Sequence, residues 1–537
     1  MSFDKKVFQI RNGIKRYSKI SIVKNLLQRL HSRDRNQPSA FMRHWVVCLM
    51  LEWTLELDNN KSTKEATSGD VQKLLDKLWM VSSDALDLSK SKNVWLTMCI
   101  GLLQQLRFQA DQSENIYFLA RLYTIMCEKS SSTYFKNEFK KHTGIELNDF
   151  FVFAFFLGFI FKDNDKPYYS YSRLIPLLLP GFSYEFVQKA LLLIGSDLNS
   201  LQSLMLNMKP QTNVKHVSRE EYFAEPKLLL KPIIFLPEGL CTPHSYIALI
   251  GVSEFVLRTL KKAAPEKFRQ KFSIAFEQYI GSLFKDFSYQ VHTEKVLKNI
   301  YKKHNIQGKS VDFLHTSREV SIFFDAKGVE PKQDLLLTDN EVLIKDKLRD
   351  TILKGITQAA ECIDKLVNVS EIKIAPFEKR YALVITHQDF YLGNGVKLAS
   401  YLGDEYRVRI DDVVKDKLPL DNVHFCGVAE LENILAACRA AGTSLDNFLD
   451  FCTVEEADPH TAKFMIKQHI EAYKKKHNIE QMAFGTDRLN TVIDELSSKA
   501  HLSIQTSQKY WKQGSFLMDD YIQLKNEFLN MSVRRNY

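Results

Sequence analysis

Hydrophobic residues recur at two different spacings along this chain, and the change of spacing divides it into regions. From residue 37 to about residue 205 they recur three and four positions apart, the spacing of one buried face of an α-helix. Glycine and proline are scarce there before Pro167, and no fixed-period repeat is present. The pattern therefore predicts a helical region. Its predicted helices are Trp45–Leu55, Val71–Val81, Val94–Arg107, Tyr117–Cys127 and Tyr184–Met208.

The longest uninterrupted apolar run lies inside this region, from Phe150 to Phe161, and is twelve residues long. A helix needs roughly 20 mostly apolar residues to cross the hydrocarbon core of a bilayer. We therefore expect a buried core helix at this position and no membrane span.

A proline-rich segment follows. Prolines at 210, 226, 232, 237 and 243 disfavour helix, while Leu228–Leu236 is a short apolar run of the kind that forms a strand. We place a domain boundary there. Beyond it, short runs with strand-like alternation are separated by runs with helical spacing.

The predicted order after this boundary is helix, three strands, helix and strand, with one more strand and helix closing the region near residue 455. A polar connection, Val329–Asp346, precedes the second helix. The predicted elements are helix Pro265–Phe287, strands Tyr289–Leu297, Lys309–His315 and Val320–Gly328, helix Leu348–Leu366, strands Arg380–Thr386 and Asn422–Val428, and helix Ala429–Ala441.

Helical spacing returns in the last part of the chain, and Ser503–Gln513 has the length of one helix of a helix-turn-helix. The predicted helices are His460–Asn478, Thr486–Leu502 and Phe516–Met531. The fold class is therefore α/β plus all-α. The predicted domains are a helical region (1–209), a connecting segment (210–244), an α/β domain (245–455) and a C-terminal helical region (456–537).

Charge is concentrated at the N-terminus. The formal net charge is +9, and residues 1–36 carry +8 of it, because ten Lys or Arg face only two Asp there. The apolar residues of this segment recur at helical spacing, which predicts a basic amphipathic helix. Packing on the next domain, contact with nucleic-acid phosphates and association with an anionic membrane all stay open. The apolar residues are Phe3, Val7, Ile10, Ile14 and Tyr17.

Eight cysteines lie far apart, with no C-x-x-C pair, which argues against a zinc ribbon, a redox motif or a disulfide framework. We expect buried, reduced thiols in a cytoplasmic protein. The sequence also lacks the glycine, serine and histidine motifs of P-loop ATPases, dinucleotide-binding enzymes, serine hydrolases and zincins. Any ATPase would be a separate protein.

Two acids and a lysine stand on the second and third predicted strands. Side chains alternate along a strand, so Asp325 and Lys327 should project to one face while Phe324 and Ala326 project to the other. Asp312 lies on the neighbouring strand, thirteen positions earlier. Carboxylates converging beside a lysine suit a divalent cation and a phosphate.

This pattern resembles the PD-(D/E)XK nuclease superfamily, which includes restriction endonucleases and has an αβββαβ core around a mixed sheet. Asp312 and Asp325-Ala326-Lys327 match its motif, although Val311 replaces the usual proline and Asp325 stands where Glu is commoner. The resemblance covers roughly residues 245–455.

The resemblance implies a role for each residue. Asp312, Asp325 and the backbone carbonyl of Ala326 would hold Mg²⁺, for which Mn²⁺ can substitute. Lys327 would orient or deprotonate the attacking water or stabilise charge. Glu277, on the preceding predicted helix, matches an acid that many members use as a second-metal or outer-shell ligand.

The helix after the motif carries a polar stripe beside its buried one. Lys347, Thr351, Lys354 and Gln358 are separated by four, three and four residues. Gln358 matches a glutamine that contacts the active site in part of the family, and Lys347 and Lys354 would suit phosphates. His292, His315 and His387 lie near the predicted sheet ends, and we interpret them as structural because no partner at metal-ligand spacing accompanies them.

The resemblance implies an endonuclease, with DNA favoured and RNA, including tRNA, as the second choice. Single-chain proteins of this build resemble bacterial anti-phage effectors, in which a helical domain responds to a phage-derived protein trigger. The alternative is a catalytically silent fold that acts as a nucleic-acid-binding or scaffold protein. The sequence leaves cut specificity, trigger and oligomeric state open.

Overall fold

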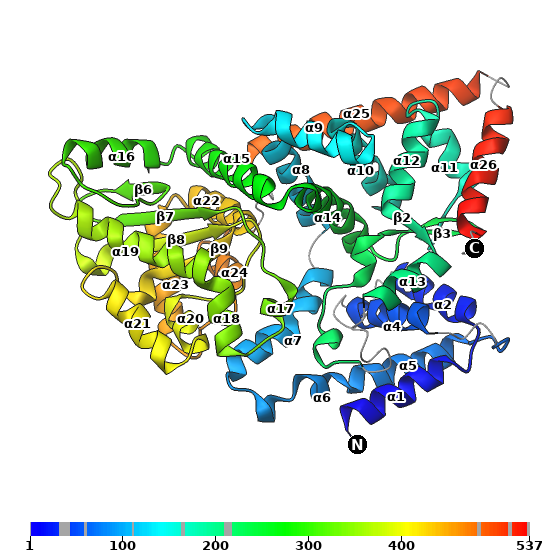
Figure 1. Cartoon of the computed structure of the whole chain (residues 1–537), viewed down its shortest axis with the longest axis horizontal. Coiled ribbons are helices and arrows are strands. Elements are labelled where there is room, and N and C mark those ends of the chain that lie inside the picture. The colour runs from blue at the N-terminus through cyan, green and yellow to red at the C-terminus, as the bar shows by residue number, and fades with distance from the viewer. Residues whose placement is uncertain are drawn as a thin grey trace.

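A computed structural model describes residues 2–31, 43–57, 62–109, 112–162, 167–208, 217–480, 485–513 and 518–533. The fold is mixed α/β and mostly helical, with two small mixed sheets in the described residues. Figure 1 shows the larger sheet and its helices on one side of the molecule and the helical region on the other.

The larger sheet has five strands in the order β5-β6-β7-β8-β9. The strands β5, β6 and β7 pair antiparallel, whereas β7, β8 and β9 pair parallel. The strands are β5 (His292–Thr293), β6 (Phe313–Thr316), β7 (Ser321–Lys327), β8 (Arg380–Thr386) and β9 (Val423–Gly427). Four predicted strands are therefore confirmed, as β6, β7, β8 and β9, and β8 has the predicted bounds.

Helices cover both faces of this sheet. The helices α15 (Pro265–Asp286) and α22 (Val428–Ala441) share a buried cluster with Phe324 and Ala326, while α16 (Glu294–Lys303) and α19 (Lys354–Leu366) share another with Phe323. The predicted alternation along β7 is confirmed by this division. Further helices of the region are α17 (Gln333–Leu336), α18 (Glu341–Leu348), α20 (Gly395–Tyr401), α21 (Asp404–Val414), α23 (Leu445–Ala457) and α24 (Ile466–Lys476).

The predicted strand Tyr289–Leu297 is wrong for most of its length. Only His292 and Thr293 pair with β6, and the helix α16 begins at Glu294. The helix buries Leu297 and Tyr301, which are four residues apart, in one cluster with α19. The alternating pattern ended at Val296, which is exposed. Burial of Leu297 and Tyr301 therefore favours a helix over a strand in this segment.

The predicted polar connection Val329–Asp346 is also corrected, because it contains α17 and most of α18. A π-helical turn, Arg349–Leu353, then joins α18 to α19. Leu336 and Ile344 are buried, which explains why short helices form in a mainly polar segment.

The helical region forms as predicted in outline, and α10 is the expected buried helix. Its helices are α1 (Phe3–Ile14), α2 (Lys19–His31), α4 (His44–Glu56), α5 (Ser68–Met80), α6 (Ser82–Leu86), α7 (Val94–Gln109), α8 (Gln112–Tyr123), α9 (Ser132–Thr143), α10 (Leu147–Lys162), α11 (Tyr171–Leu178), α12 (Tyr184–Ile194) and α13 (Leu198–Asn207). The helix α14 (Ser245–Ala263) packs on α8, α9 and α10 of this region, although the predicted α/β domain begins at residue 245.

The predicted single helix Tyr184–Met208 is wrong, because the strand β2 (Gly195–Asp197) separates α12 from α13. A Cβ at Gly195 would lie 2.6 Å from a ring carbon of Phe235, so only glycine lets β2 approach the neighbouring strand. Asp197 then accepts hydrogen bonds from two backbone amides and caps α13. The second sheet is β1-β4-β3-β2, with β1 (Tyr169–Ser170), β3 (Ile233–Leu236) and β4 (Gly239–Cys241).

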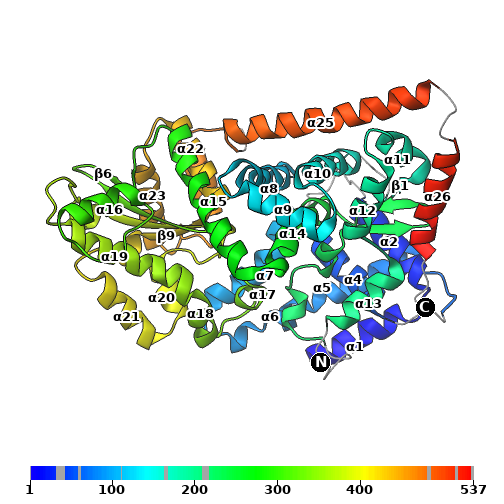
Figure 2. The same ribbon diagram turned by 45° about the horizontal axis from the view of Figure 1, so that its top comes forward.

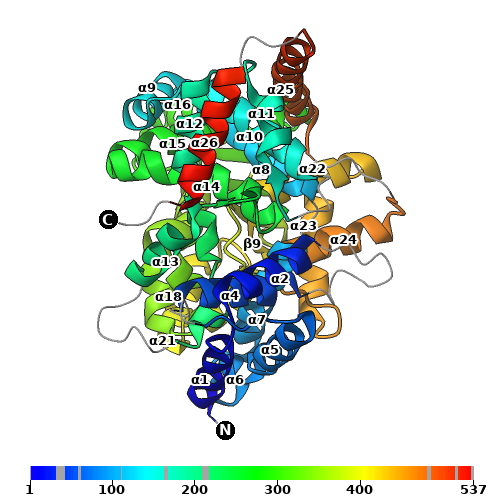
Figure 3. The same ribbon diagram turned by 90° about the vertical axis from the view of Figure 1, so that its right-hand side faces the viewer.

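The basic N-terminal segment forms α1 and α2, which pack on the rest of the helical region. Phe3, Val7, Ile10 and Ile14 are buried in one cluster with α4 and α5. Figure 3 shows these N-terminal helices gathered on the side of the molecule opposite α25. Residues 32–36 of the predicted basic segment lie outside the described residues.

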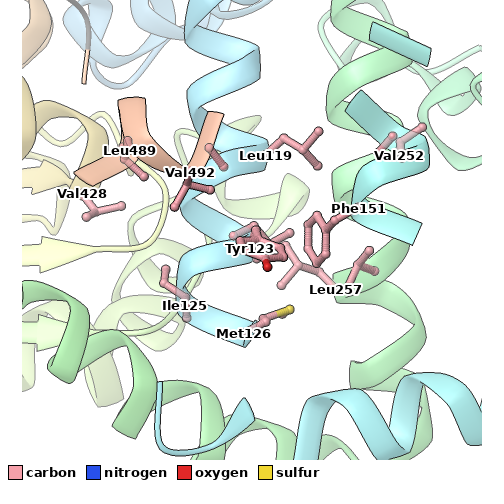
Figure 4. Close-up of a cluster of buried hydrophobic side chains, with 14 of the residues drawn as sticks. Leu119, Tyr123, Ile125, Met126, Phe151, Val252, Leu257, Val428, Leu489 and Val492 are labelled. Atoms are coloured by element: carbon pink, nitrogen blue, oxygen red, sulfur yellow. The ribbon is translucent and has the colours of Figure 1, made fainter. Parts of the chain in front are cut away.

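The C-terminal helices return to the helical region. The helix α25 (Asp487–Lys512) lies along α8, α10 and α11, and α26 (Met518–Val533) packs on α11 and the small sheet (Figure 2). Because α25 continues through Ser503 to Lys512, the run Ser503–Gln513 is not a separate helix. Figure 4 shows that side chains of α8, α10, α14, α22 and α25 meet in one core.

All eight cysteines are buried and form no disulfide, as predicted. In the described parts of the chain, no single helix has both the length and the apolar character of a membrane span; the bent pair Ser132–Thr143 and Leu147–Phe161 meets the test only when taken together.

The neighbouring histidines His44 and His244 predict an acid-sensitive fold. Their rings are hydrogen-bonded at 3.2 Å. Burial and the charge of His31 lower the pKa of His44 to about 4, and burial together with the charges of His44 and His31 lowers the pKa of His244 to about 3. Stability is therefore full above the ordinary histidine pKa of about 6.5 and is lost as the pH falls below it. We expect His244→Asn, which still caps α14, to remove part of this loss, on the order of 2 kcal/mol between about pH 7.5 and about pH 5. Urea unfolding at both pH values measures it. Equal losses in both proteins would contradict the assignment.

Candidate functional site

The two predicted acids meet where β6 and β7 pair. Asp325 lies in β7 and is only 2% exposed, and Asp312 immediately precedes β6. Phe313 pairs with Phe324, so the next residues of the hairpin, Asp312 and Asp325, oppose each other. A carboxylate oxygen of Asp312 accepts a hydrogen bond of 2.7 Å from the backbone amide of Ala326. This bond holds the Asp312 side chain beside β7, where the regular strand pairing has stopped.

Lys327 lies beside this pair of carboxylates. Its Nζ is 2.6 Å from Oδ2 of Asp325, and it also donates a hydrogen bond of 3.1 Å to Oε1 of Gln358 on α19. The Nε2 of Gln358 donates in turn to the backbone oxygen of Ser310, at 3.3 Å. The predicted glutamine is therefore in the site, where it orients the lysine.

The charge of Asp325 disfavours ionisation of Asp312. Burial, and secondly the charge of Asp325, raise the pKa of Asp312 to about 8. Asp325 Oδ1 is buried and accepts no hydrogen bond within the described chain, so Lys327 satisfies only one of its two oxygens. A buried anion with an unpaired oxygen beside a second acid is a favourable place for a cation.

Glu277 of α15 lies at the edge of the same group. Burial raises its pKa first, and the nearby charges of Glu294 and Asp325 raise it further. The structure thus brings Glu277 into the electrostatic range of both motif strands, on the side of α15 that faces α16.

The sequence did not identify Glu294 as a site residue, although it belongs to the group around Asp312 and Asp325. Its backbone amide donates a hydrogen bond of 2.7 Å to the backbone oxygen of Asp312, at the first residue of α16. The i,i+4 pair with Lys298, at 2.7 Å, was the sequence signal that could have revealed both the helix and the residue.

Gly355 allows α19 to approach Asp325. A Cβ at this position would lie 2.6 Å from Oδ2 of Asp325 and 3.0 Å from a methyl group of Val384 on β8. The helix, the strand and the carboxylate therefore leave no room for any side chain at residue 355.

This close approach gives a testable expectation. Gly355→Ala should push α19 away from β7 and displace Asp325, lowering the free energy of unfolding by about 1–3 kcal/mol. Gly69→Ala in α5 is the matched control, because its Cβ would meet nothing closer than 3.8 Å. Chemical unfolding of both variants measures the difference. If Gly355→Ala is as stable as the control, the space beside Asp325 is larger than the structure indicates.

The two predicted phosphate-binding lysines have different surroundings. Lys347 forms an ion pair of 2.6 Å with Asp334 of α17, and Lys354 is exposed at the start of α19. The π-helical turn between them changes the rotation of the helix, so the predicted stripe from Lys347 to Gln358 is wrong as a continuous α-helical stripe.

The three histidines near the sheet ends have structural partners. His387 is buried against Phe272 and hydrogen-bonded to Glu330 at 3.2 Å, and His315 is hydrogen-bonded to the backbone of residue 290 at 2.7 Å. His292 begins β5, half-buried. These contacts agree with the structural interpretation.

The described residues contain no group of three or more His, Cys, Asp or Glu side chains arranged to hold a metal ion. The donors available for a cation are the carboxylates of Asp312 and Asp325 and the carbonyl of Ala326. Such a set fits Mg²⁺, which usually keeps several waters and binds through one or two carboxylates. It does not fit a zinc site, which would need three or four side-chain ligands.

Comparison of the chain with family models, with curated protein sequences and with solved structures gave no match.

Proposed function

We propose that this protein is a metal-dependent nuclease that hydrolyses phosphodiester bonds, with Asp312, Asp325 and Lys327 at its centre. The observation that carries the proposal is the buried Asp325 carboxylate, which opposes Asp312, pairs through one oxygen with Lys327 and leaves its other oxygen unpaired. The order α15-β5-α16-β6-β7-α17-α18-α19-β8 supports it, because without the inserted helices α16, α17 and α18 it corresponds to the αβββαβ core of the PD-(D/E)XK nucleases that the sequence resembles.

The residues have distinct roles in this proposal. Asp312, Asp325 and the Ala326 carbonyl would hold Mg²⁺, or Mn²⁺ in its place. When bound, the cation neutralises charge on the phosphate and lowers the pKa of a water ligand. Lys327 orients the attacking water or neutralises phosphate charge, and Gln358 is a positioning residue that holds its amine. Glu277 acts from the edge of the site as an outer ligand.

We propose that the helical region controls this activity. Lys261 of α14 forms an ion pair with Glu330, only three residues after Lys327 along the chain. A movement of α14 would therefore be transmitted through this ion pair to the end of β7. We propose an anti-phage effector of the cytoplasm that a phage-derived protein activates; the eight unbridged cysteines support a reducing compartment.

The test is cleavage by the purified chain. Plasmid, single-stranded DNA and total RNA would each be incubated with it in Mg²⁺ or in EDTA. We expect cleavage that requires the metal, with DNA the favoured substrate and RNA the second. Cleavage that is unaffected by EDTA would contradict the site. Binding without cleavage in every condition would favour the silent, nucleic-acid-binding alternative.

A further inference from the structure

The helix α16, which replaces a predicted strand, presents a stripe of lysines to solvent. Lys295, Lys298 and Lys302 follow each other at three and four residues and are all exposed. Leu297 and Tyr301 lie on the opposite side of the helix and are buried against α19 and the sheet. We call the three lysines the α16 stripe.

The fold does not use the charges of this stripe. Within the described residues Lys295 and Lys302 form no ion pair, and Lys298 pairs only with Glu294 of the same helix. Lys303, which lies beside the stripe, is different: it forms an ion pair with Glu371 on the loop after α19. The helix is held by its apolar side and by the hydroxyl of Tyr301, which donates to Cys362 Sγ at 3.2 Å.

The α16 stripe begins at the candidate site. The first residue of α16, Glu294, donates its amide to the backbone of Asp312 and contributes to the raised pKa of Glu277. Lys298 lies close enough to Glu277 to oppose that rise. The stripe therefore begins next to the acidic group, on a helix that lies at the outer edge of the molecule beside β6 (Figure 1).

We propose that the α16 stripe binds the phosphate backbone of a nucleic-acid strand and guides it to Asp312 and Asp325. This inference rests on the proposed nuclease function and deepens it by assigning the surface that holds the substrate. From Lys295 to Lys302 the stripe covers about 10 Å of helix. Since one strand carries a charge about every 3.4 Å along the duplex axis, it matches about three successive phosphates. The occupant is a polyanion because the exposed side of α16 is cationic and its apolar side is already buried.

The test is the salt dependence of binding in EDTA, where a metal-dependent enzyme does not cut its ligand. Fluorescence anisotropy with labelled duplex and single-stranded oligonucleotides would compare the wild type with Lys295→Gln/Lys302→Gln. Loss of two phosphate contacts should make the negative slope of log K against log salt less steep, by about 1.8 on duplex and by about 1.4 on single strands. On duplex this is roughly 60-fold weaker binding at about 0.1 M salt. The strand type whose loss reaches its own expected value identifies the substrate form.

Lys303→Gln is the control within the same helix, since it removes one lysine charge that lies off the stripe. Its slope should stay near that of the wild type, and thermal unfolding should be unchanged for all variants. An unchanged slope in the double variant would overturn the inference, even if the wild type cleaves nucleic acid in Mg²⁺. Equal losses in the double variant and the control, or stripe-dependent binding to phosphatidylserine vesicles instead of oligonucleotides, would also overturn it. If the double variant shows the less steep slope but the wild type never cleaves nucleic acid, the inference is supported and the nuclease function alone is removed.

Discussion

Replacing Asp325 with asparagine should abolish metal-dependent cleavage, by roughly 10³-fold or more, in a protein that stays folded. The amide keeps the shape of the side chain but removes the charge that Lys327 pairs with and that a cation would need. Because the charge of Asp325 helps to raise the pKa of Asp312, that pKa should also fall from its value of about 8. Initial cleavage rates in Mg²⁺ measure the loss of activity, and thermal unfolding shows whether the protein stays folded.

Asp334→Asn is the matched control for this variant. Asp334 is also an ion-paired aspartate of the sheet region, but its side chain is 48% exposed and its partner is Lys347, away from the two acids. We expect its cleavage rate to stay within about twofold of the wild type, since exposed ion pairs contribute little. A similar small effect from Asp325→Asn would show that β7 does not carry the active site.

Replacing Arg121 with alanine should destabilise the protein by about 3–5 kcal/mol, the largest effect we expect on the fold. Arg121 of α8 makes two bonds of 2.7 Å to Glu432 of α22, and these side chains are 4% and 1% exposed. Tyr279 of α15 donates a further bond of 2.6 Å to Glu432. Without the guanidinium, Glu432 remains as a buried charge. Guanidinium unfolding, followed by the midpoint and slope of the transition, measures the loss.

Two comparisons distinguish a buried charge from a lost contact. The double variant Arg121→Met/Glu432→Leu should recover most of the stability, because it leaves no unpaired ion. Arg269→Ala should cost less than about 0.5 kcal/mol, since its pair with Glu266 is exposed. If Arg121→Ala costs as little as Arg269→Ala, the helical region and the sheet region are not joined through this ion pair.

The sequence by itself determined the elements whose partners are close along the chain. The alternation in Val320–Gly328 placed Asp325 and Lys327 on one face, and the short turn before it brought Asp312 opposite Asp325. Hairpin register depends on a few neighbouring residues, so it can be worked out locally. The contact of Gln358 with the site was implied by the family resemblance, and a plain apolar run defined β8.

Only the tertiary structure decided the features that depend on distant contacts. Residues 294–303 became a helix because burying Leu297 and Tyr301 on α19 outweighed a short alternating pattern. The segment 184–208 was divided by a strand because Gly195 fits against Phe235, forty residues away along the chain. Glu432 and Arg121 are separated by 311 positions, and no periodicity connects them.

The same limit applies to the site. Local spacing identified two acids and a lysine, because they lie on paired strands with a regular period, and the family resemblance added the glutamine. It did not show that Gly355 makes room for Asp325, that Glu294 joins the group, or that Lys347 is paired with Asp334. Those facts come from how helices pack on the sheet, since side-chain neighbours across an interface are set by the whole core rather than by the residues beside them.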